Sequence, residues 1–242
     1  MRPMLYSAAV GNTSKRAILD LPAYTVREAA HYLTIPLATV RSWSAGRPYP
    51  TKRGKKFFKP VLVLPETRPP ILSFTNLVEA HVLDAIRRQH QIPLDKIRLA
   101  MKYLEEQFGS EHPLADYRLE TDGLDLFVRE YGRLINITRS GQIAIKEFLE
   151  GYLKRIERNS VGEAVRLYPF TRKRTIDEPR LVVIDPSVSF GRPVLSGTGV
   201  PTSAIAERYK AGESVPQLAN DYGRSTEEIE EAIRCELQLE AA

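Results

Sequence analysis

Apolar residues recur at helical spacing in two short segments near the start of the chain. A helix is predicted over residues 25–33, and its apolar face is formed by Val26, Ala29, Ala30 and Leu33. Thr25 and Glu28 have the spacing of a capping box, which favours a helix start at this point. Residues 35–36 predict a tight turn, and a second helix is expected over residues 37–43. Together the two helices have the pattern of a helix-turn-helix.

The second of these helices has the features of a recognition helix. Its predicted buried positions are apolar and comprise Leu37, Val40 and Trp43. A helix that reads the major groove carries small or hydrogen-bonding side chains outward, on a rigid apolar support. The outward positions are expected to be Ala38, Thr39, Arg41, Ser42 and Ser44. Of these, we expect Thr39, Arg41 and Ser42 to contact base edges, with Ser44 exposed beside them.

The segment that follows is basic and prone to β structure. Residues 46–50, with Gly46 and two prolines, predict the end of the helix. Residues 51–59 place Gly54 between basic residues and suit a hairpin wing with a cationic tip. The wing cations predicted to contact phosphates, and so to add affinity without sequence information, are Lys52, Arg53, Lys55 and Lys56. Residues 60–70, with four prolines, predict a linker.

The middle of the chain, residues 69–175, combines helical and alternating patterns. Amphipathic helices that begin at Ser73 and Pro93 are expected to form an antiparallel hairpin. Residues 117–128 alternate around Asp122-Gly123, which is a favoured hairpin turn, and residues 134–137 offer a third short strand. A further helix is predicted over 142–153 and a strand over 164–170.

The last part, residues 176–242, is predicted to begin with a strand over 181–184 and a passage rich in Gly and Pro. Three helices follow, ending near Tyr209, Tyr222 and Leu239, and two of them have capping-box pairs (Ser214 with Gln217, Ser225 with Glu228). The predicted fold class is α+β and mostly α: a winged helix-turn-helix over 1–68, a central helical hairpin with small antiparallel strands over 69–175, and a helix-turn-helix-like domain over 176–242.

Charge is distributed unevenly along the chain. The first sixty residues carry eleven Lys or Arg and two acids, whereas the last thirty carry eight acids and two arginines. The basic end is therefore expected to bind a polyanion, and with the wing beside the helix-turn-helix we favour DNA over a merely solvated hairpin. The helix-turn-helix-like segment 215–234 is rejected as a DNA reader, because its predicted exposed face carries Asp221, Glu227, Glu228, Glu230 and Glu231. Dimerisation or partner contact suits it better.

The residues that could support chemistry are sparse. Cys235 is the only cysteine, so neither a disulfide nor a cysteine zinc site is expected within the chain. The four histidines, His31, His81, His90 and His112, have no metal-ligand spacing. The glycines at 191, 197 and 199 do not match a phosphate-binding loop. We expect no enzyme, no metal, no cofactor and, since no apolar run nears about 18 residues, no membrane span and a cytoplasmic location.

Residues 183–201 and 209–219 resemble a domain of unknown function, DUF433, found in antitoxins of bacterial toxin–antitoxin pairs. The matching elements are Asp185-Pro186, Gly191-Arg192-Pro193 and Gly212-Glu213-Ser214, while Gly199 stands where the family pattern has Arg. Residues 58–60, 71–83 and 87–88 look like longer members with an N-terminal DNA-binding half. Residues 24–43 are also similar to the opening of MerR-type regulators.

The resemblance implies a VapB-like antitoxin that represses its own operon and neutralises a PIN-like ribonuclease toxin. Since such nucleases cluster carboxylates around a divalent metal, inserted cations could compete for that site. The candidates for toxin contact are Arg155, Arg158, Arg172, Lys173 and Arg174. A homodimer would place two recognition helices on palindromic operator DNA. Two alternatives stay open: a MerR-like regulator that senses a small ligand in a pocket of the central strands, and an interaction scaffold whose basic end binds RNA or nothing.

Overall fold

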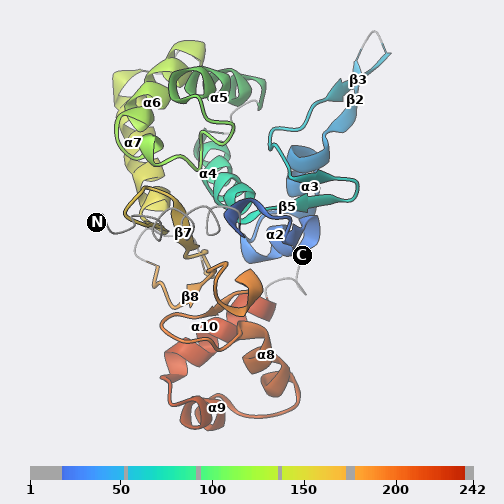
Figure 1. Ribbon diagram of the computed structural model, residues 1–242, viewed down its shortest axis with the longest axis vertical. Helices are drawn as coiled ribbons and strands as arrows, with labels where there is room; N and C mark the ends of the chain where they lie inside the picture. Colours follow the sequence, from blue (N-terminus) through green and yellow to red (C-terminus); the bar gives the residue numbers. More distant parts are fainter. Residues whose placement is uncertain (1–17, 52–53, 91–93, 136–137, 173–177, 238–242) are drawn as a thin grey trace, which may run out of the picture.

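Helices form most of the secondary structure, and the strands are short and antiparallel (Figure 1). The structure is a computed structural model that describes residues 18–51, 54–90, 94–135, 138–172 and 178–237. The predicted fold class, α+β with a majority of helix, is confirmed. Within these residues, no helix is both long enough and apolar enough to cross a membrane.

The predicted helix-turn-helix is present. It consists of α2 (Val26–Tyr32) and α3 (Leu37–Ala45), and the short strand β1 (Tyr24–Thr25) precedes α2. The capping box forms as expected: the Glu28 amide donates to Thr25 Oγ1 at 3.1 Å, and the Thr25 amide donates to Glu28 Oε2 at 2.9 Å. Because both bonds join residues three apart in sequence, the start of α2 is encoded locally.

The predicted wing is also present, as an antiparallel hairpin of β2 (Arg47–Thr51) and β3 (Gly54–Phe58). The hairpin projects away from the body of the molecule (Figure 1). Its first strand begins earlier than predicted, since Arg47 already pairs with Phe58. The prolines of β2 are compatible with this strand, because the two-stranded hairpin leaves one edge of each strand unpaired.

Residues 60–70, predicted as a linker, are instead part of the packed structure. The amides of Val61 and Leu62 donate to the Trp43 carbonyl at 2.8 and 3.1 Å, and Leu62 is buried. The segment continues into β4 (Glu66–Thr67) and β5 (Pro70–Leu72), which form a three-stranded sheet with β1 in the order β1-β5-β4. The linker prediction is therefore wrong: this segment closes the end of α3.

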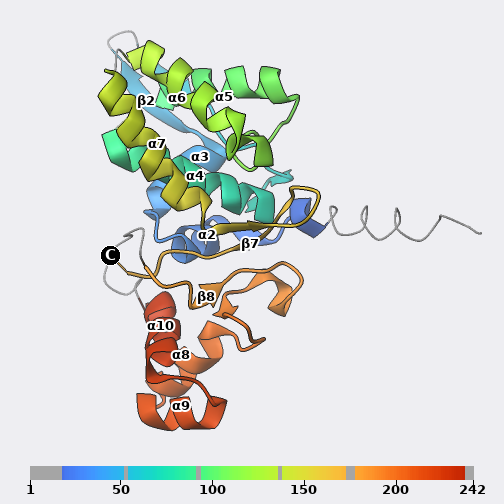
Figure 2. The same cartoon turned by 90° about the vertical axis from the view of Figure 1, so that its left-hand side faces the viewer.

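Four helices make up the central part: α4 (Phe74–His90), α5 (Leu94–Phe108), α6 (Asp122–Ile135) and α7 (Arg139–Leu153). The predicted helices at 73, 93 and 142 are thus confirmed. Their packing differs from the prediction, because α4 lies against α7 and α5 lies against α6 in place of an α4–α5 hairpin (Figure 2).

The helix α6 lies where the sequence predicts a β-hairpin and part of a third strand, so that prediction is wrong; residues 136–137 fall outside the described residues. The buried side chains of α6 recur at helical spacing, and they are Leu124, Phe127, Val128 and Tyr131. Gly123 does not form a turn; it allows close packing between α6 and its neighbours. A Cβ at this position would lie 2.4 Å from the Phe108 ring and 2.6 Å from the Arg118 carbonyl oxygen.

Two small hairpins lead from α7 toward the C-terminal helices: β6 (Ile156–Arg158) with β7 (Ala164–Leu167), and β8 (Val182–Val183) with β9 (Val194–Leu195). Short 3-10 turns occur at η1 (Tyr117–Leu119) and η2 (Ser189–Gly191). The three predicted C-terminal helices are α8 (Thr202–Lys210), α9 (Val215–Tyr222) and α10 (Thr226–Leu237). The capping boxes at Ser214 and Ser225 both form.

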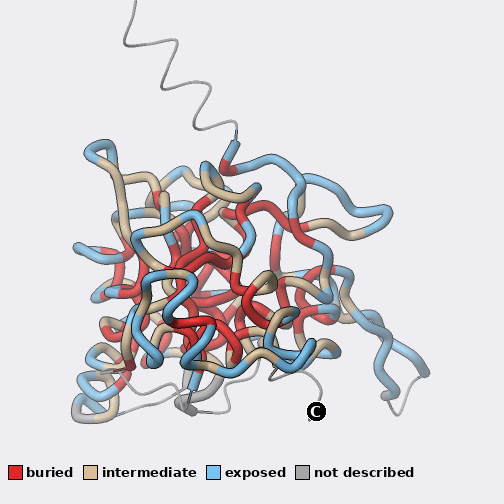
Figure 3. The backbone as a smooth tube through the Cα atoms, turned by 90° about the horizontal axis from the view of Figure 1, so that it is seen from below, coloured by how far each residue is buried: buried red, intermediate tan, exposed pale blue. Residues whose placement is uncertain are grey.

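Buried residues gather in the interior, whereas the described residues of the wing are mostly exposed (Figure 3). The larger core is shared by the helix-turn-helix and the four central helices. A smaller core holds the C-terminal helices together, with Leu195, Ile205, Leu218, Ile229 and Ala232. The helix α2 lies between the central and C-terminal helices (Figure 2). The Tyr24 hydroxyl donates to the Gly191 carbonyl at 3.1 Å, and His31 Nε2 lies 3.5 Å from Glu236 Oε2. The C-terminal part is therefore joined directly to the helix-turn-helix.

Candidate nucleic-acid interface

The exposed face of α3 is a stripe formed by Ala38, Arg41 and Ala45. These positions are three and four residues apart, so their side chains lie above one another on one side of the helix. The arginine is flanked by methyl groups, which leave room for the helix to approach another surface closely. A guanidinium presented in this way can form two hydrogen bonds to a guanine edge, and an alanine can contact a thymine methyl. Arg41 and Ala38 are therefore exposed as predicted.

Ser42 and Ser44 do not take part in this stripe. Both are buried, with 8% and 4% of their surface exposed, and neither hydroxyl has a hydrogen-bond partner among the described residues. The reason is tertiary: β5 and the 61–62 segment pack on α3 beyond the face that its apolar residues define. Thr39 is half-buried on the other side of the helix from Arg41. The prediction that Ser42 and Ser44 point outward is wrong.

The described cations of the wing are exposed. Lys55 and Lys56 are exposed on β3, while Lys52 and Arg53 lie outside the described residues. Gly46 sets the direction in which the hairpin leaves α3. Its φ is 72°, and a Cβ there would lie 2.3 Å from the Phe58 carbonyl oxygen. Only glycine fits this junction without displacing the wing.

The fold brings further cations to the base of the wing, which the sequence interpretation missed. Arg47 on β2 lies near Arg87 on α4, and burial together with the Arg47 charge lowers the pKa of Arg87. Arg98 on α5 donates to the Lys59 carbonyl at 2.6 Å and stacks over the Phe58 ring at 4.7 Å. Arg98 therefore fixes the wing to the central helices, and Arg47 and Arg87 extend its positive surface. No sequence signal connects these residues, because they come from three separate elements.

The helix α10 carries the opposite charge, with five glutamates and one arginine. Glu227 and Glu230 are exposed on α10 as expected, and Asp221 accepts from Arg208 Nη2 at 2.5 Å. Glu231, also predicted to be exposed, is buried. It binds Arg172 at 2.6 Å and also contacts Thr171 and Arg234. The prediction fails for Glu231 because this carboxylate holds the 171–172 segment against α10.

Two of the five cations assigned to toxin contact donate to backbone carbonyls inside the fold. Arg155 is 1% exposed, and its guanidinium donates to the carbonyls of Tyr168, Pro169, Glu178 and Pro179 at 2.7–3.3 Å. Burial lowers the pKa of Arg155 to about 10. Arg158 donates to Glu120 Oε1 at 2.6 Å and to the Ala115 and Gly162 carbonyls at 2.8 and 3.1 Å. A buried arginine with its donors used by the backbone cannot enter a partner's site, so the assignment of Arg155 is wrong, and that of Arg158 meets the same obstacle.

The remaining three cations lie in one segment. Arg172 is 36% exposed and is paired with Glu227 and Glu231 on α10, at 3.3 and 2.6 Å. Lys173 and Arg174 lie outside the described residues.

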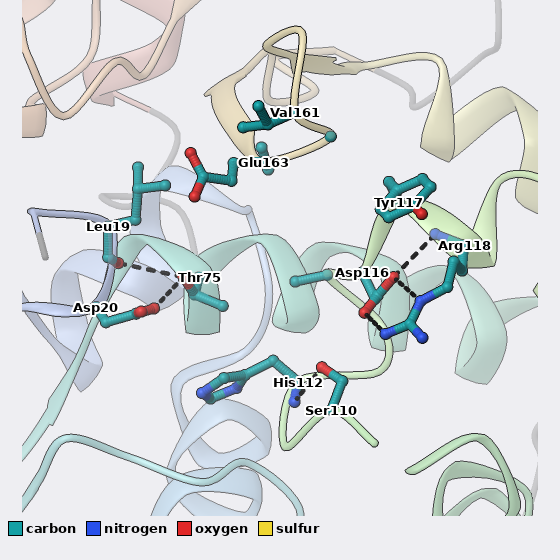
Figure 4. Close-up of a pocket in the computed structure, with 13 residues that line it drawn as sticks. Leu19, Asp20, Thr75, Ser110, His112, Asp116, Tyr117, Arg118, Val161 and Glu163 are labelled. Carbon is teal, nitrogen blue, oxygen red and sulfur yellow. Dashed lines mark hydrogen bonds and ion pairs between the residues drawn. The ribbon is translucent and has the colours of Figure 1, made fainter. Parts of the chain in front are cut away.

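An open cavity of about 380 Å³ lies at the start of α4, where Thr75 lines it, and Figure 4 shows the residues around it. Its charged groups largely satisfy one another: Thr75 Oγ1 donates to Asp20 at 2.6 Å, and Arg118 donates to Asp116 at 2.6 and 2.9 Å. His112 lines the cavity, and its Nδ1 lies 2.9 Å from the buried Glu79 Oε2. Among the described residues, no group of three or more His, Cys, Asp or Glu side chains could hold a metal ion.

Two family descriptions match separate parts of the chain. Residues 22–101 match a "Putative DNA-binding HTH domain", and residues 182–234 match "Protein of unknown function (DUF433)". The first match covers the helix-turn-helix, the wing, α4 and the first half of α5, including Arg98. It therefore includes every element that contributes to the basic surface described above.

Whole-chain relatives are found in Mycobacterium tuberculosis (strain ATCC 25618 / H37Rv). One, named "Putative antitoxin VapB45", is 31% identical over 88% of this chain and 93% of its own length. A second, "Uncharacterized protein Rv2308", is 29% identical over 91% of this chain and 92% of its own. The crystal structure of Rv2018 from Mycobacterium tuberculosis has a TM-score of 0.63 and 25% identity, covering 89% of this chain and 99% of that chain.

These similarities extend over most of this chain and most of each relative. The chain belongs to the VapB45 family, with a helix-turn-helix DNA-binding domain at its N-terminal end and a DUF433 domain at its C-terminal end.

Proposed function

We propose that this protein is an antitoxin that binds operator DNA, represses its own operon and neutralises a PIN-like ribonuclease. The observation that carries the DNA half of the proposal is the exposed stripe of α3, with Arg41 between two alanines, beside a basic wing. The antitoxin half is supported by the likeness to the relative named "Putative antitoxin VapB45" over most of both chains.

Each part of the basic surface has a separate task in this proposal. Arg41 reads a base edge in the major groove, and Ala38 and Ala45 allow the helix to seat. Lys55 and Lys56 bind phosphates on one side, and Arg47 with Arg87 extends the phosphate contact toward α4. A homodimer places two such surfaces on the two halves of a palindromic operator.

Neutralisation of the toxin requires an accessible surface. Arg155 and Arg158 are used inside the fold, so the cations that could enter a carboxylate-lined nuclease site are Arg172, Lys173 and Arg174. Arg172 would first have to leave Glu231. Changing Arg172, Lys173 and Arg174 together to Ala tests this route: inhibition that survives the triple change rules it out.

The experiment that tests the proposed function uses the protein encoded by the adjoining reading frame. That protein is assayed for cleavage of RNA, alone and with the purified full-length chain. We expect cleavage that is suppressed at stoichiometric amounts of this chain and a complex that survives gel filtration. An adjoining protein that neither cleaves RNA nor binds the chain would contradict the proposal.

The cavity beside His112 favours a second candidate function, a regulator that senses a small ligand. In that case a small molecule should release operator DNA from the purified protein without any partner protein. The predicted hairpin over 117–128 is absent, because η1 and α6 occupy these residues, whereas the predicted strand over 164–170 is present in part as β7, whose Ala164 lines the cavity. The cavity lies between the start of α4, the loop before η1 and the β6–β7 hairpin.

A further inference from the structure

The loop between β8 and β9 presents an aromatic side chain to solvent almost completely. Phe190 is 96% exposed, the highest value among the large apolar side chains that the structure describes as exposed. It lies in η2, in the orange segment that follows β8 (Figure 2). Placing a phenyl ring in water opposes the hydrophobic effect. Single exposed apolar side chains are common on protein surfaces, but a ring this exposed offers nearly its whole surface to a partner.

The backbone at this loop is held in a conformation that ordinary residues avoid. Ser189 and Phe190 have φ values of 47° and 56°, and Gly191 follows at 74°. The left-handed region is unfavourable for residues with a side chain, and such strain persists where the surrounding structure enforces it. Glycine at position 190 would suit the backbone better, so stability does not explain the phenylalanine.

The surroundings make the loop rigid. Asp185 Oδ1 accepts from the Ser187 amide and hydroxyl at 2.9 and 2.5 Å, and Arg166 donates to the same carboxylate's Oδ2 at 2.8 Å. The Gly191 carbonyl accepts from the buried Tyr24 hydroxyl of the helix-turn-helix at 3.1 Å. A Cβ on Gly191 would lie 2.3 Å from that hydroxyl oxygen, which fixes the spacing of the two segments. A side chain on such a support loses little freedom when it binds.

A cation follows the ring two residues later. Arg192 is 60% exposed, and its nearest carboxylate is Glu28 Oε1 at 3.7 Å, a long ion pair that leaves donors of the guanidinium unused. The loop therefore offers a rigid phenyl ring with an accessible positive charge close by in the chain. The complementary surface is an apolar pocket rimmed by a carboxylate, which is a feature of folded proteins and not of nucleic acid.

We propose that Phe190 and Arg192 form the site at which the partner protein of this antitoxin docks, with Phe190 filling an apolar pocket of the partner and Arg192 pairing with an acid at its rim. The inference rests on the proposed function, since it names the surface through which the toxin is held. It also separates holding the toxin from the blocking of its catalytic centre by the 172–174 segment. Aromatic and arginine side chains are the residues that most often dominate such interfaces.

The test measures the affinity of the full-length chain for the purified protein of the adjoining reading frame by calorimetry. Phe190→Gly and Phe190→Ala should each weaken binding at least about tenfold. Phe190→Gly should also raise the thermal midpoint of the free protein, because it relieves the left-handed backbone. A residue with a purely structural role could not give tighter folding and weaker binding together. Ile143→Ala on α7, where the side chain is 53% exposed, is the matched control and should bind as the wild type does.

Each outcome decides between named possibilities. Unchanged binding by both Phe190 variants, with a complex still formed, overturns this inference and leaves the proposed function standing. A wild-type chain that does not bind the adjoining protein overturns both. A third outcome is that the wild type is a homodimer, that changing Phe190 dissociates it, and that the affinity for the adjoining protein stays the same. That result overturns the inference and shows that Phe190 contacts a second copy of this chain.

Discussion

Among single residues, Arg41 bears most of the proposed base recognition, because Ser42 and Ser44 are buried and Thr39 is half-buried. With one exposed arginine between two alanines, α3 offers a single side chain that can form hydrogen bonds to a base edge. The energetic consequence is that a single truncation should remove most of the sequence preference contributed by α3.

Arg41→Ala should weaken operator binding by about 1–3 kcal/mol and relax the preference at the contacted base pair. The measurement is fluorescence anisotropy with the operator and with scrambled duplexes at constant salt. Arg133→Ala on α6, an exposed arginine paired with Glu130, is the control and should leave both affinities unchanged. Equal loss on operator and scrambled DNA would mean that Arg41 contacts phosphate and not a base.

The pair of Glu79 and His112 makes stability depend on pH. Burial raises the pKa of Glu79. Burial acts to lower the pKa of His112, but the hydrogen bond and charge of Glu79 outweigh it and raise that pKa. Both groups therefore hold protons more tightly in the folded state than in the unfolded chain. The stability that the pair contributes is therefore present at low pH. It is lost as the pH rises above the ordinary pKa of Glu, about 4.3, and continues to be lost as the pH passes above the ordinary pKa of His, about 6.5.

We expect the wild type to lose stability, relative to the double variant Glu79→Gln with His112→Gln, as pH rises from about 5 to about 8. Urea unfolding of both proteins at several pH values gives the difference between their free energies of unfolding. Contributions from all other titrating groups are the same in both proteins and cancel in this difference. A difference that is constant, or that grows in favour of the wild type with rising pH, would show that the pair does not take up protons on folding.

What the sequence predicts at this scale depends on how local each interaction is. The exposure of Arg41 follows from helical spacing within α3, and the start of α2 follows from a capping box formed within three residues. The burial of Ser42 and Ser44 depends on β5 and on Val61 and Leu62, which return to α3 from later in the chain. No periodicity within residues 37–45 contains that information.

At the scale of elements, the proposed function makes the wing and α3 act together on DNA. Gly46 sets the angle between them, and Arg98 fixes the wing to α5. A phosphate contact adds affinity that salt weakens, whereas a base contact adds specificity. The two elements should therefore respond to different variables.

Lys55→Ala with Lys56→Ala should reduce the slope of log affinity against log salt by about 0.9 for each phosphate that the variant no longer neutralises, while the ratio of operator to scrambled affinity stays constant. Titrations at several salt concentrations measure the slope. Lys146→Ala with Lys154→Ala on and just after α7 removes the same charge away from the wing and should leave the slope unchanged. An unchanged slope in the wing variant would show that Lys55 and Lys56 do not contact phosphates.

The elements that the sequence fails to predict are those whose partners are distant. The region of α6 contains an Asp-Gly pair and partial alternation, and both favour a hairpin by local criteria. Its helical spacing prevails because α5 supplies an apolar surface for Leu124, Phe127, Val128 and Tyr131. Likewise, the glycine at 123 permits contact with Phe108, a role that composition alone cannot reveal.

Across the whole molecule, opposite charges lie on different parts of the chain, and packing joins those parts. The basic wing projects at one end, and the C-terminal helices, of which α10 is the most acidic, lie at the other (Figure 1). The hydrogen bond from Tyr24 to Gly191 and the contact of His31 with Glu236 join the helix-turn-helix directly to the C-terminal part. The predicted rejection of residues 215–234 as a DNA reader agrees with their exposed acids, although Glu231 itself is buried. The proposed partner site at Phe190 lies at this junction.

Recognition of the protein's own operator through α3 is tested most directly by footprinting on the DNA upstream of its own gene. We predict two protected half-sites related by a palindrome, with centres about 10–10.5 base pairs or a multiple of that apart, and loss of this protection with Arg41→Ala. Uniform protection along the fragment, or a discrete footprint that Arg41→Ala leaves intact, would contradict operator recognition by this helix.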